Sequence, residues 1–119
     1  MITIAIVDTD ATTRAQVTKL FGSSSYIVEE FESSEQLLNS SSLSKLNCLM
    51  LSPEATYTET KKLINAIRKQ NKETAIIAIG ENDELAQAVT CLRAGADDYL
   101  FKPLNNGTIR ALVRQLLAK

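Results

Sequence analysis

The chain has 119 residues, which suffice for one domain that buries its own core, and we expect a single domain over residues 1–119. It carries 13 basic and 14 acidic residues, a net charge of -1, so we expect neither direct nucleic-acid binding nor attraction to an anionic membrane. The sequence contains no histidine, which excludes Ser-His-Asp and Cys-His catalysis and imidazole-based metal sites.

The cysteines and the N-terminus bear on the cellular compartment. Cys48 and Cys91 belong to neither a CxxC pair nor a metal-type spacing, so we expect two reduced, buried thiols. No run approaches about 18 apolar residues, and no basic segment precedes a long apolar one, so neither a membrane span nor a signal peptide is predicted. These observations favour a soluble, cytoplasmic module.

The N-terminal residues predict a strand and a helix joined by an acidic turn. Residues 2–7 form a β-branched run typical of a buried strand, and the run stops at Asp8. Asp10 is positioned to cap a helix over residues 11–21, and Gly22 is positioned to end it.

The next segment predicts weaker elements. Residues 26–31 have the pattern of a strand whose charges suggest a position near the sheet edge. Ser33 and Gln36 form a possible capping box for a short helix, and the serines at 40–42 predict a loop.

The stretch from Leu46 to Pro53 predicts the central strand. It is nearly all apolar and too short for a typical buried helix, so we expect a strand that is covered on both faces. Ligands of open parallel sheets collect at the carboxyl ends of central strands, and Ser52 ends this one. Chemistry is therefore expected near Ser52.

The second half of the chain continues the alternation. Strands are predicted at residues 75–79 and 99–101, and a helix is predicted over residues 58–70. The basic face of this helix is interpreted as solvated, with anion binding as the alternative: Lys61, Lys62, Arg68, Lys69 and Lys72. Helical spacing before Gly95 recurs at Leu85, Ala88, Val89 and Leu92. A final helical stripe comprises Ile109, Leu112, Val113, Leu116 and Leu117.

Predicted strands that alternate with helices, several of them apolar throughout, call for a parallel sheet with helices on both faces. Right-handed crossovers then favour a doubly wound α/β fold, for which the flavodoxin-like strand order 2-1-3-4-5 suits five strands best. In this order the first and third strands are neighbours. Their carboxyl ends bring Asp8, Thr9 and Ser52 to one crevice, with Gly80 and Lys102 beside it.

Residues 4–8 and 94–103 resemble the receiver domain of response regulators, the CheY-like module of two-component signalling, and the resemblance extends over the whole chain. In that family an acidic pair after strand one and an aspartate ending strand three hold Mg²⁺. The strand-three aspartate accepts a phosphoryl group. A Ser or Thr ending strand four and a Lys ending strand five contact that group. An aromatic residue in strand five reports the switch, and a proline, usually in a cis bond, follows the lysine.

The resemblance is incomplete at the phosphorylation pocket. The positions that match are Asp8 for the first acid, Tyr99 for the aromatic, Lys102 for the lysine and Pro103 for the proline. The positions that fail are Thr9 for the second acid, Ser52 for the phosphoacceptor and Gly80 for the hydroxyl residue. We interpret this set as a degenerate pocket.

These differences predict lost chemistry. Mg²⁺ is held by carboxylates together with phosphate and water, and Asp8 alone makes only a weak metal ligand, so we expect weak or absent Mg²⁺ binding and no cofactor. The Ser52 hydroxyl would need a base, which no histidine supplies. Glu54, after Pro53, is a poor substitute acceptor. Lys102 is interpreted as an ion-pair partner of Asp8, with anion or effector binding as the alternative.

The resemblance and its gaps favour a single receiver-like domain that is not an enzyme. We expect a pseudo-receiver that works as a phosphorylation-independent interaction or dimerisation module for an output domain or partner. Its possible interaction face on helix four, strand five and helix five carries Arg93, Asp97, Asp98, Tyr99, Arg110 and Arg114. The match to the DNA-binding branch of the family is partial, since Leu112 stands where that branch often has an arginine.

Several alternatives stay open. Tyr99 is either a moving switch residue or a static strand residue. The domain could be a phosphorylatable receiver with an unusual acceptor. It could also be a flavodoxin-type small-ligand binder, as the hydroxyls of Thr9, Thr12 and Thr13 suggest. The sequence is compatible with a stand-alone protein and with the front end of a longer regulator.

Overall fold

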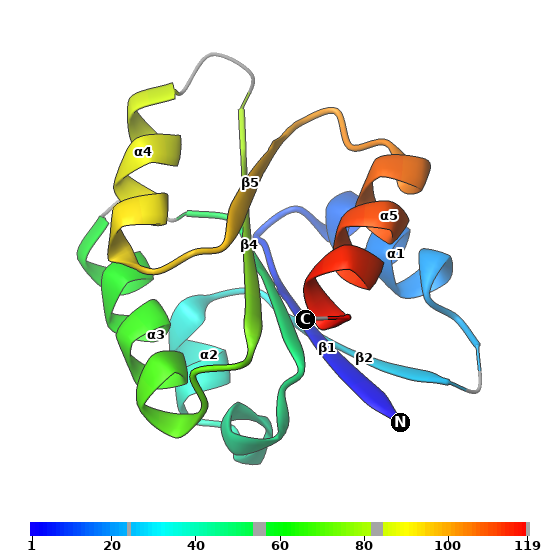
Figure 1. The fold of residues 1–119 in the computed structure, drawn as a ribbon, viewed down its shortest axis with the longest axis horizontal. Helices are drawn as coiled ribbons and strands as arrows, with labels where there is room; N and C mark the ends of the chain where they lie inside the picture. Colours follow the sequence, from blue (N-terminus) through cyan, green and yellow to red (C-terminus); the bar gives the residue numbers. More distant parts are fainter. Residues whose placement is uncertain (24, 54–56, 82–84, 119) are drawn as a thin grey trace.

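The computed structural model describes residues 1–23, 25–53, 57–81 and 85–118. In this part of the chain a five-stranded parallel sheet has the order β2-β1-β3-β4-β5 (Figure 1). Its strands are β1 Ile2–Val7, β2 Tyr26–Phe31, β3 Cys48–Leu51, β4 Ala75–Gly80 and β5 Asp98–Phe101. The helices are α1 Ala11–Leu20, α2 Ser34–Leu38, α3 Tyr57–Gln70, α4 Leu85–Ala94 and α5 Asn106–Leu117. The predicted doubly wound, flavodoxin-like order is confirmed.

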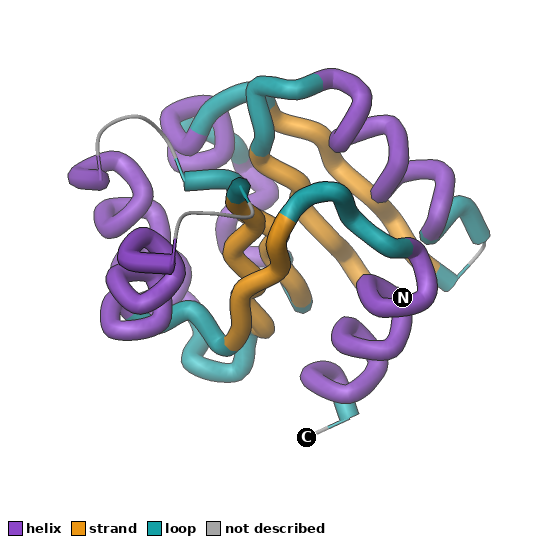
Figure 2. The backbone as a smooth tube through the Cα atoms, turned by 90° about the horizontal axis from the view of Figure 1, so that it is seen from above, coloured by secondary structure: helices purple, strands orange, loops and turns teal. Residues whose placement is uncertain are grey.

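The sheet separates two apolar cores. On one face α1 and α5 pack against strand residues such as Ile6, Met50 and Ile77. On the other face α2, α3 and α4 cover residues such as Leu49 and Ala78. Figure 2 shows the strands between the two helical layers. Every residue of β3 is buried, which confirms that this strand is central and covered on both sides.

The helix starts agree with the capping residues predicted for them. Asp10 accepts a hydrogen bond from the backbone N–H of Thr12, and Ser33 accepts one from Gln36. The Gln36 side chain accepts from the N–H of Glu32 rather than from that of Ser33 itself, so the capping box is shifted by one residue.

Three details differ from the sequence predictions. The serines at 40–42 do not form a plain loop, because a 3-10 helix, η1, spans Ser41–Lys45 and the Ser40 side chain caps it. β3 begins at Cys48 rather than at Leu46 and ends at Leu51, so Ser52 directly follows the strand.

The third difference concerns the buried face of α4. This helix contacts the core through the small side chains of Ala88 and Cys91, which lets it approach the sheet closely. Its larger apolar side chains are therefore turned toward solvent, where Leu85, Val89 and Leu92 are 69%, 41% and 43% exposed. Of the predicted apolar stripe on this helix, only Ala88 is buried.

Candidate functional site

The carboxyl ends of β1 and β3 form a crevice of about 360 Å³, as the topology predicted. Its lining comprises Val7, Asp8, Thr9, Glu32, Ser33, Ser52 and Pro53. Asp8, Thr9 and Ser52 are thus brought together. Glu32 and Ser33, which follow the neighbouring strand β2, were not predicted as lining residues. They reach the crevice because β2 pairs in parallel with β1 and ends at the same edge of the sheet.

Asp8 is the centre of the crevice, and its side chain is only 2% exposed. Its Oδ1 accepts a hydrogen bond from the backbone N–H of Asp10 at 2.8 Å. Its Oδ2 accepts one from the Ser52 hydroxyl at 2.6 Å. The same Oδ2 lies 3.0 Å from Nζ of Lys102. Both carboxylate oxygens therefore have donors within the domain, and the charge has a partly buried cationic partner.

Lys102 reaches Asp8 from the end of β5, so the predicted ion pair between these residues is present. The Lys102 backbone N–H donates to the carbonyl oxygen of Gly80 at 2.7 Å, which fixes the start of the loop against β4. The bond between Lys102 and Pro103 is cis. The Lys102 side chain is 21% exposed, so its ammonium group is mostly removed from water.

Arg14 is a further contributor that the sequence did not indicate. Its Nη1 donates to the backbone carbonyl of Asp8 at 2.7 Å, and its Nε lies 3.4 Å from a carboxylate oxygen of Glu30. Arginine in the first helix gave no sequence signal, because its partners lie on β2 and at the end of β1. This side chain braces the turn that carries Asp8.

Gly80 ends β4, and the phenol ring of Tyr99 lies against it. A Cβ atom added to Gly80 would lie 1.6 Å from the Tyr99 hydroxyl oxygen. Tyr99 is 8% exposed, its hydroxyl donates to Oε1 of Gln87 at 3.3 Å, and its ring centroid is 5.0 Å from that of Phe101. The aromatic side chain therefore points into the molecule.

The hydroxyl groups after β1 are largely engaged in starting α1. Thr13 donates its hydroxyl to Asp10 Oδ2 at 3.3 Å, and Asp10 caps the helix. The backbone hydrogen bond from Thr12 holds the pKa of Asp10 below its ordinary value of 3.8. A carboxylate at this helix start disfavours a bound phosphate, so these contacts give no support to a flavodoxin-type cradle.

The residues of the predicted interaction face differ in exposure, because some are free on the surface of the helices and others make contacts within the molecule. Arg93, Arg110 and Arg114 are exposed on α4 and α5. Asp97 instead accepts hydrogen bonds from the backbone N–H of Ile76 and from Arg68 within the molecule. Asp98 accepts one from its neighbouring backbone N–H at Tyr99, and Tyr99 itself is buried.

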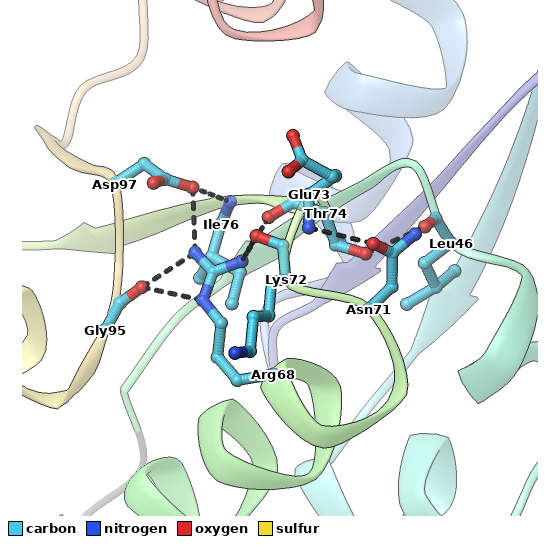
Figure 3. A network of polar contacts seen from close by, with 9 residues as sticks. All are labelled: Leu46, Arg68, Asn71, Lys72, Glu73, Thr74, Ile76, Gly95 and Asp97. Carbon is cyan, nitrogen blue, oxygen red and sulfur yellow. Dashed lines mark hydrogen bonds and ion pairs between the residues drawn. The ribbon is translucent and has the colours of Figure 1, made fainter.

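Arg68 belongs to a network at the opposite end of the sheet (Figure 3). Its guanidinium donates to the carbonyl oxygens of Gly95, Lys72 and Thr74 and to the carboxylate of Asp97. The prediction that Arg68 belongs to a solvated basic face is therefore wrong for this residue. Its neighbours Lys61, Lys62, Lys69 and Lys72 are exposed, as predicted.

Within the residues that the structure describes, the cysteines and acidic side chains give no sign of a metal or thiol site. Both cysteines are free and buried, as predicted. Burial raises the pKa of the Cys48 thiol to about 12 and also raises that of Cys91. The described ranges hold no group of three or more His, Cys, Asp or Glu side chains arranged for a metal ion. Glu54 lies outside the described residues.

None of the helices in the part of the chain covered by the structure combines the length and the apolar character needed to cross a membrane.

Two curated proteins are similar to this chain in sequence over most of its length. The chain is 27% identical over 94 residues to the transcriptional regulatory protein PcoR of Escherichia coli. The aligned residues cover 79% of this chain and 42% of PcoR. It is 28% identical over 105 residues to the two-component response regulator-like protein PRR1 of Oryza sativa subsp. japonica, covering 85% of this chain and 20% of that protein. The chain thus spans less than half the length of either relative.

Solved structures of receiver domains and a family model also match this chain. The BeF3-activated DrrB receiver domain is 25% identical with a TM-score of 0.87, covering 100% of this chain and 99% of that one. A CheY-like receiver domain protein from Methanospirillum hungatei has the same fold, with a TM-score of 0.84 at 22% identity, covering 99% of this chain and 94% of that one. The family model of the response regulator receiver domain matches residues 4–114. The chain therefore belongs to the response regulator receiver domain family.

Proposed function

We propose that this receiver domain is a pseudo-receiver, a phosphorylation-independent protein–protein interaction or dimerisation module that regulates an output domain or partner. The observation that carries the proposal is the contact set of Asp8. Its Oδ2 accepts the Ser52 hydroxyl and pairs with Lys102, at 2.6 Å and 3.0 Å. The Asp8 carboxylate is thus already bound by Ser52 and Lys102 of the same domain.

The residue after β3 supports the same conclusion. Ser52 presents a hydroxyl group, which donates its proton to Asp8 in a short hydrogen bond. A serine nucleophile needs a base that removes this proton, and Asp8 is itself held by Lys102. A serine phosphate would also be a stable ester, whereas an aspartyl phosphate is a mixed anhydride that hydrolyses readily. The hydrogen bond between Ser52 and Asp8 therefore resembles a structural contact more than a nucleophile paired with its base.

The donor set also fits Mg²⁺ poorly. Mg²⁺ requires near-octahedral oxygen ligands and is usually held by one or two carboxylates plus phosphate and water. Asp8 has donors on both oxygens, and the Lys102 ammonium provides the positive charge at 3.0 Å. Thr9, exposed beside it, adds a hydroxyl instead of a second carboxylate. We therefore expect weak or absent binding of Mg²⁺, and we derive no chemistry that uses it.

The partner would contact the surface of α4, β5 and α5. Exposed arginines and apolar side chains coexist there, a mixture that suits protein contacts more than nucleic acid. Arg93, Arg110 and Arg114 offer charges for a second copy, an attached output domain or a separate protein. Light scattering at several concentrations tests the dimeric mode, and a strict monomer at high concentration excludes it.

The proposal is tested by offering the domain a phosphoryl donor. We expect that ¹⁵N resonances of residues 7–10, 52 and 102 do not move when Mg²⁺ is added with acetyl phosphate or beryllofluoride. The matched variants are Ser52→Asp and the double variant Thr9→Asp with Ser52→Asp, of which the double variant should respond most strongly. A saturable response of the natural sequence in these resonances would show a working phospho-switch and overturn the proposal.

A further inference from the structure

The first turn of α5 contains the dipeptide Asn106-Gly107, the single place in the sequence where a glycine follows an asparagine. Asparagine is a chemically labile residue type, because the backbone nitrogen of the next residue can attack its side-chain amide. Glycine favours this attack, since it has no Cβ to obstruct the nitrogen and its backbone rotates freely. Both residues are exposed, so water reaches the reacting atoms.

The Gly107 nitrogen is available as the attacking atom. Asn105 caps α5, and its side-chain oxygen accepts the N–H of Thr108 at 3.0 Å. The Gly107 N–H has no acceptor among the described residues, as is usual for the first donors of a helix. The attack requires Asn106 to rotate out of the helical conformation. Because Asn106 begins α5, this rotation breaks few intrahelical hydrogen bonds.

The Asn106 amide is held by its oxygen. Nε2 of Gln16 on α1 donates to the carbonyl oxygen of Leu104 at 3.1 Å and to Oδ1 of Asn106 at 2.9 Å. The Leu104 carbonyl can only accept, so the atom of Gln16 is a nitrogen and the atom of Asn106 that faces it is the oxygen. In the part of the chain that the structure describes, Nδ2 of Asn106 makes no hydrogen bond. Attack at Cγ moves negative charge onto Oδ1, which the Gln16 donor stabilises.

We propose that Asn106 is a site of spontaneous deamidation, in which Gly107 supplies the attacking nitrogen and Gln16 the hydrogen bond to the amide oxygen. The Gly107 amide loses its proton to hydroxide, its nitrogen bonds to Cγ of Asn106, and the Cγ–Nδ2 bond breaks. Nδ2 takes a proton from water and leaves as ammonia. Water then opens the cyclic imide at either carbonyl group, which gives aspartate or isoaspartate. The reaction needs no reagent besides water.

The aspartate product changes the charge of α5. It places a carboxylate at the first residue of the helix, where the helix dipole favours negative charge, and it keeps an oxygen for Gln16. Arg110 follows four residues later, which is the spacing of an ion pair on a helix surface. Deamidation therefore lowers the positive charge that Arg110 offers to a partner. This consequence rests on the proposed function, whereas the reaction itself does not.

The test follows each asparagine by peptide mapping and mass spectrometry of the whole chain kept in mildly alkaline buffer. Electron-transfer fragmentation separates aspartate from isoaspartate. We expect Asn106 to convert faster than Asn39, which is also exposed but precedes a serine. Conversion of Asn106 that is no faster than that of Asn39 would overturn the proposal.

Gly107→Ala is the variant that tests the attacking residue. The added Cβ obstructs the nitrogen, so we expect the conversion of Asn106 to become much slower. In the folded protein this Cβ meets Oδ1 of Asn105 at 3.2 Å, and that side chain is exposed and can move aside, so the variant keeps its fold. An unchanged rate in Gly107→Ala would overturn the assignment of Gly107.

Gln16→Leu tests the hydrogen bond to the amide oxygen. Leucine has a similar size but no donor, so we expect slower conversion of Asn106 in the folded variant. In urea-unfolded protein the variant and the natural sequence should react at the same rate, because the contact is lost in both. A folded variant that reacts as fast as the natural sequence, or faster, would overturn the role of Gln16. These measurements contain no Mg²⁺ and no phosphoryl donor, so a working phospho-switch at the crevice would leave their outcome unchanged.

Discussion

Each end of the sheet contains one charged side chain whose hydrogen-bonding groups are occupied by others of the same domain: an acceptor surrounded by donors at one end, and a donor surrounded by acceptors at the other. At the carboxyl ends, the Asp8 carboxylate receives the Ser52 hydroxyl, the Asp10 N–H and the Lys102 ammonium. At the amino ends, the Arg68 guanidinium donates to three backbone carbonyls and to Asp97. One end is where the fold family places its chemistry, whereas the other is a connection between loops.

The comparison shows that position alone does not make a reactive site. A group that binds a ligand needs unused hydrogen-bonding capacity or a charge that lacks a partner. Asp8 resembles Arg68 in this respect, since its charge and both oxygens have partners within the molecule. The crevice therefore has the local character of the structural network at the other end, which agrees with the proposed loss of phosphorylation. Variants of Arg68 and of Asp8 compare how much each end of the sheet contributes to the free energy of unfolding.

The largest effect is expected for Arg68→Met. This change removes five hydrogen bonds, leaves the Thr74 and Gly95 carbonyls short of donors and unpairs Asp97. Because the group is partly screened by water, we expect a loss of about 3 kcal/mol in the free energy of unfolding, measured in urea. The control Lys69→Met changes an exposed neighbour and should stay within about 0.5 kcal/mol. Equal losses in the two variants would show that the network has no structural weight.

A smaller effect is expected at the crevice. Asp8→Asn and Lys102→Met should each lower the free energy of unfolding by about 1–2 kcal/mol, because each leaves a partner mostly removed from water. The double variant should recover about 1 kcal/mol of the summed loss, since the two residues are in contact. Asp8→Asn combined with Arg93→Met provides an additive control pair. Additive losses for Asp8 and Lys102 would mean that the ion pair contributes nothing.

The smallest effect is expected for Asp10, which is exposed and acts as a helix cap. Its pKa is lower in the folded protein than in the unfolded chain, so the ionised carboxylate stabilises the fold above its ordinary pKa of 3.8. This contribution is lost as the pH falls below 3.8 and through the folded pKa. The stability difference between the natural sequence and Asp10→Asn should therefore shrink over this range in urea titrations. A difference that is constant with pH would contradict the capping role of the charge.

The fold was predictable because its signals are local. Apolar or β-branched runs predicted the buried strands, and Asp10 and Ser33 predicted the helix starts that the structure contains. The strand order followed from the alternation of elements and from crossover handedness. The same logic brought Asp8 and Ser52 together across β1 and β3, 44 residues apart in the chain.

The sequence predictions that were wrong concern side-chain contacts, which depend on how closely helices and strands approach each other in the folded domain. Leu85 and Val89 have the spacing of a buried stripe, yet α4 approaches the sheet through Ala88 and Cys91. The charge of Arg68 looked like part of a solvated face, because its acceptors are backbone carbonyls that no sequence pattern reveals. The ring of Tyr99 over Gly80 could be found only once both strands were placed.

The outward apolar side chains of α4 have a practical consequence for handling the protein. Leu85, Val89 and Leu92 form an exposed stripe on a domain whose net charge is only -1 at neutral pH. Molecules with so little charge repel each other weakly, so apolar contacts between stripes are opposed by little. The chain has no histidine, so this charge changes little just below pH 7 and reaches zero only near the isoelectric point of about 5.4, where carboxylates begin to be protonated. We therefore expect the solubility of the domain to be lowest near pH 5.4, and a Val89→Glu substitution, which interrupts the stripe and adds a negative charge, to raise it at neutral pH.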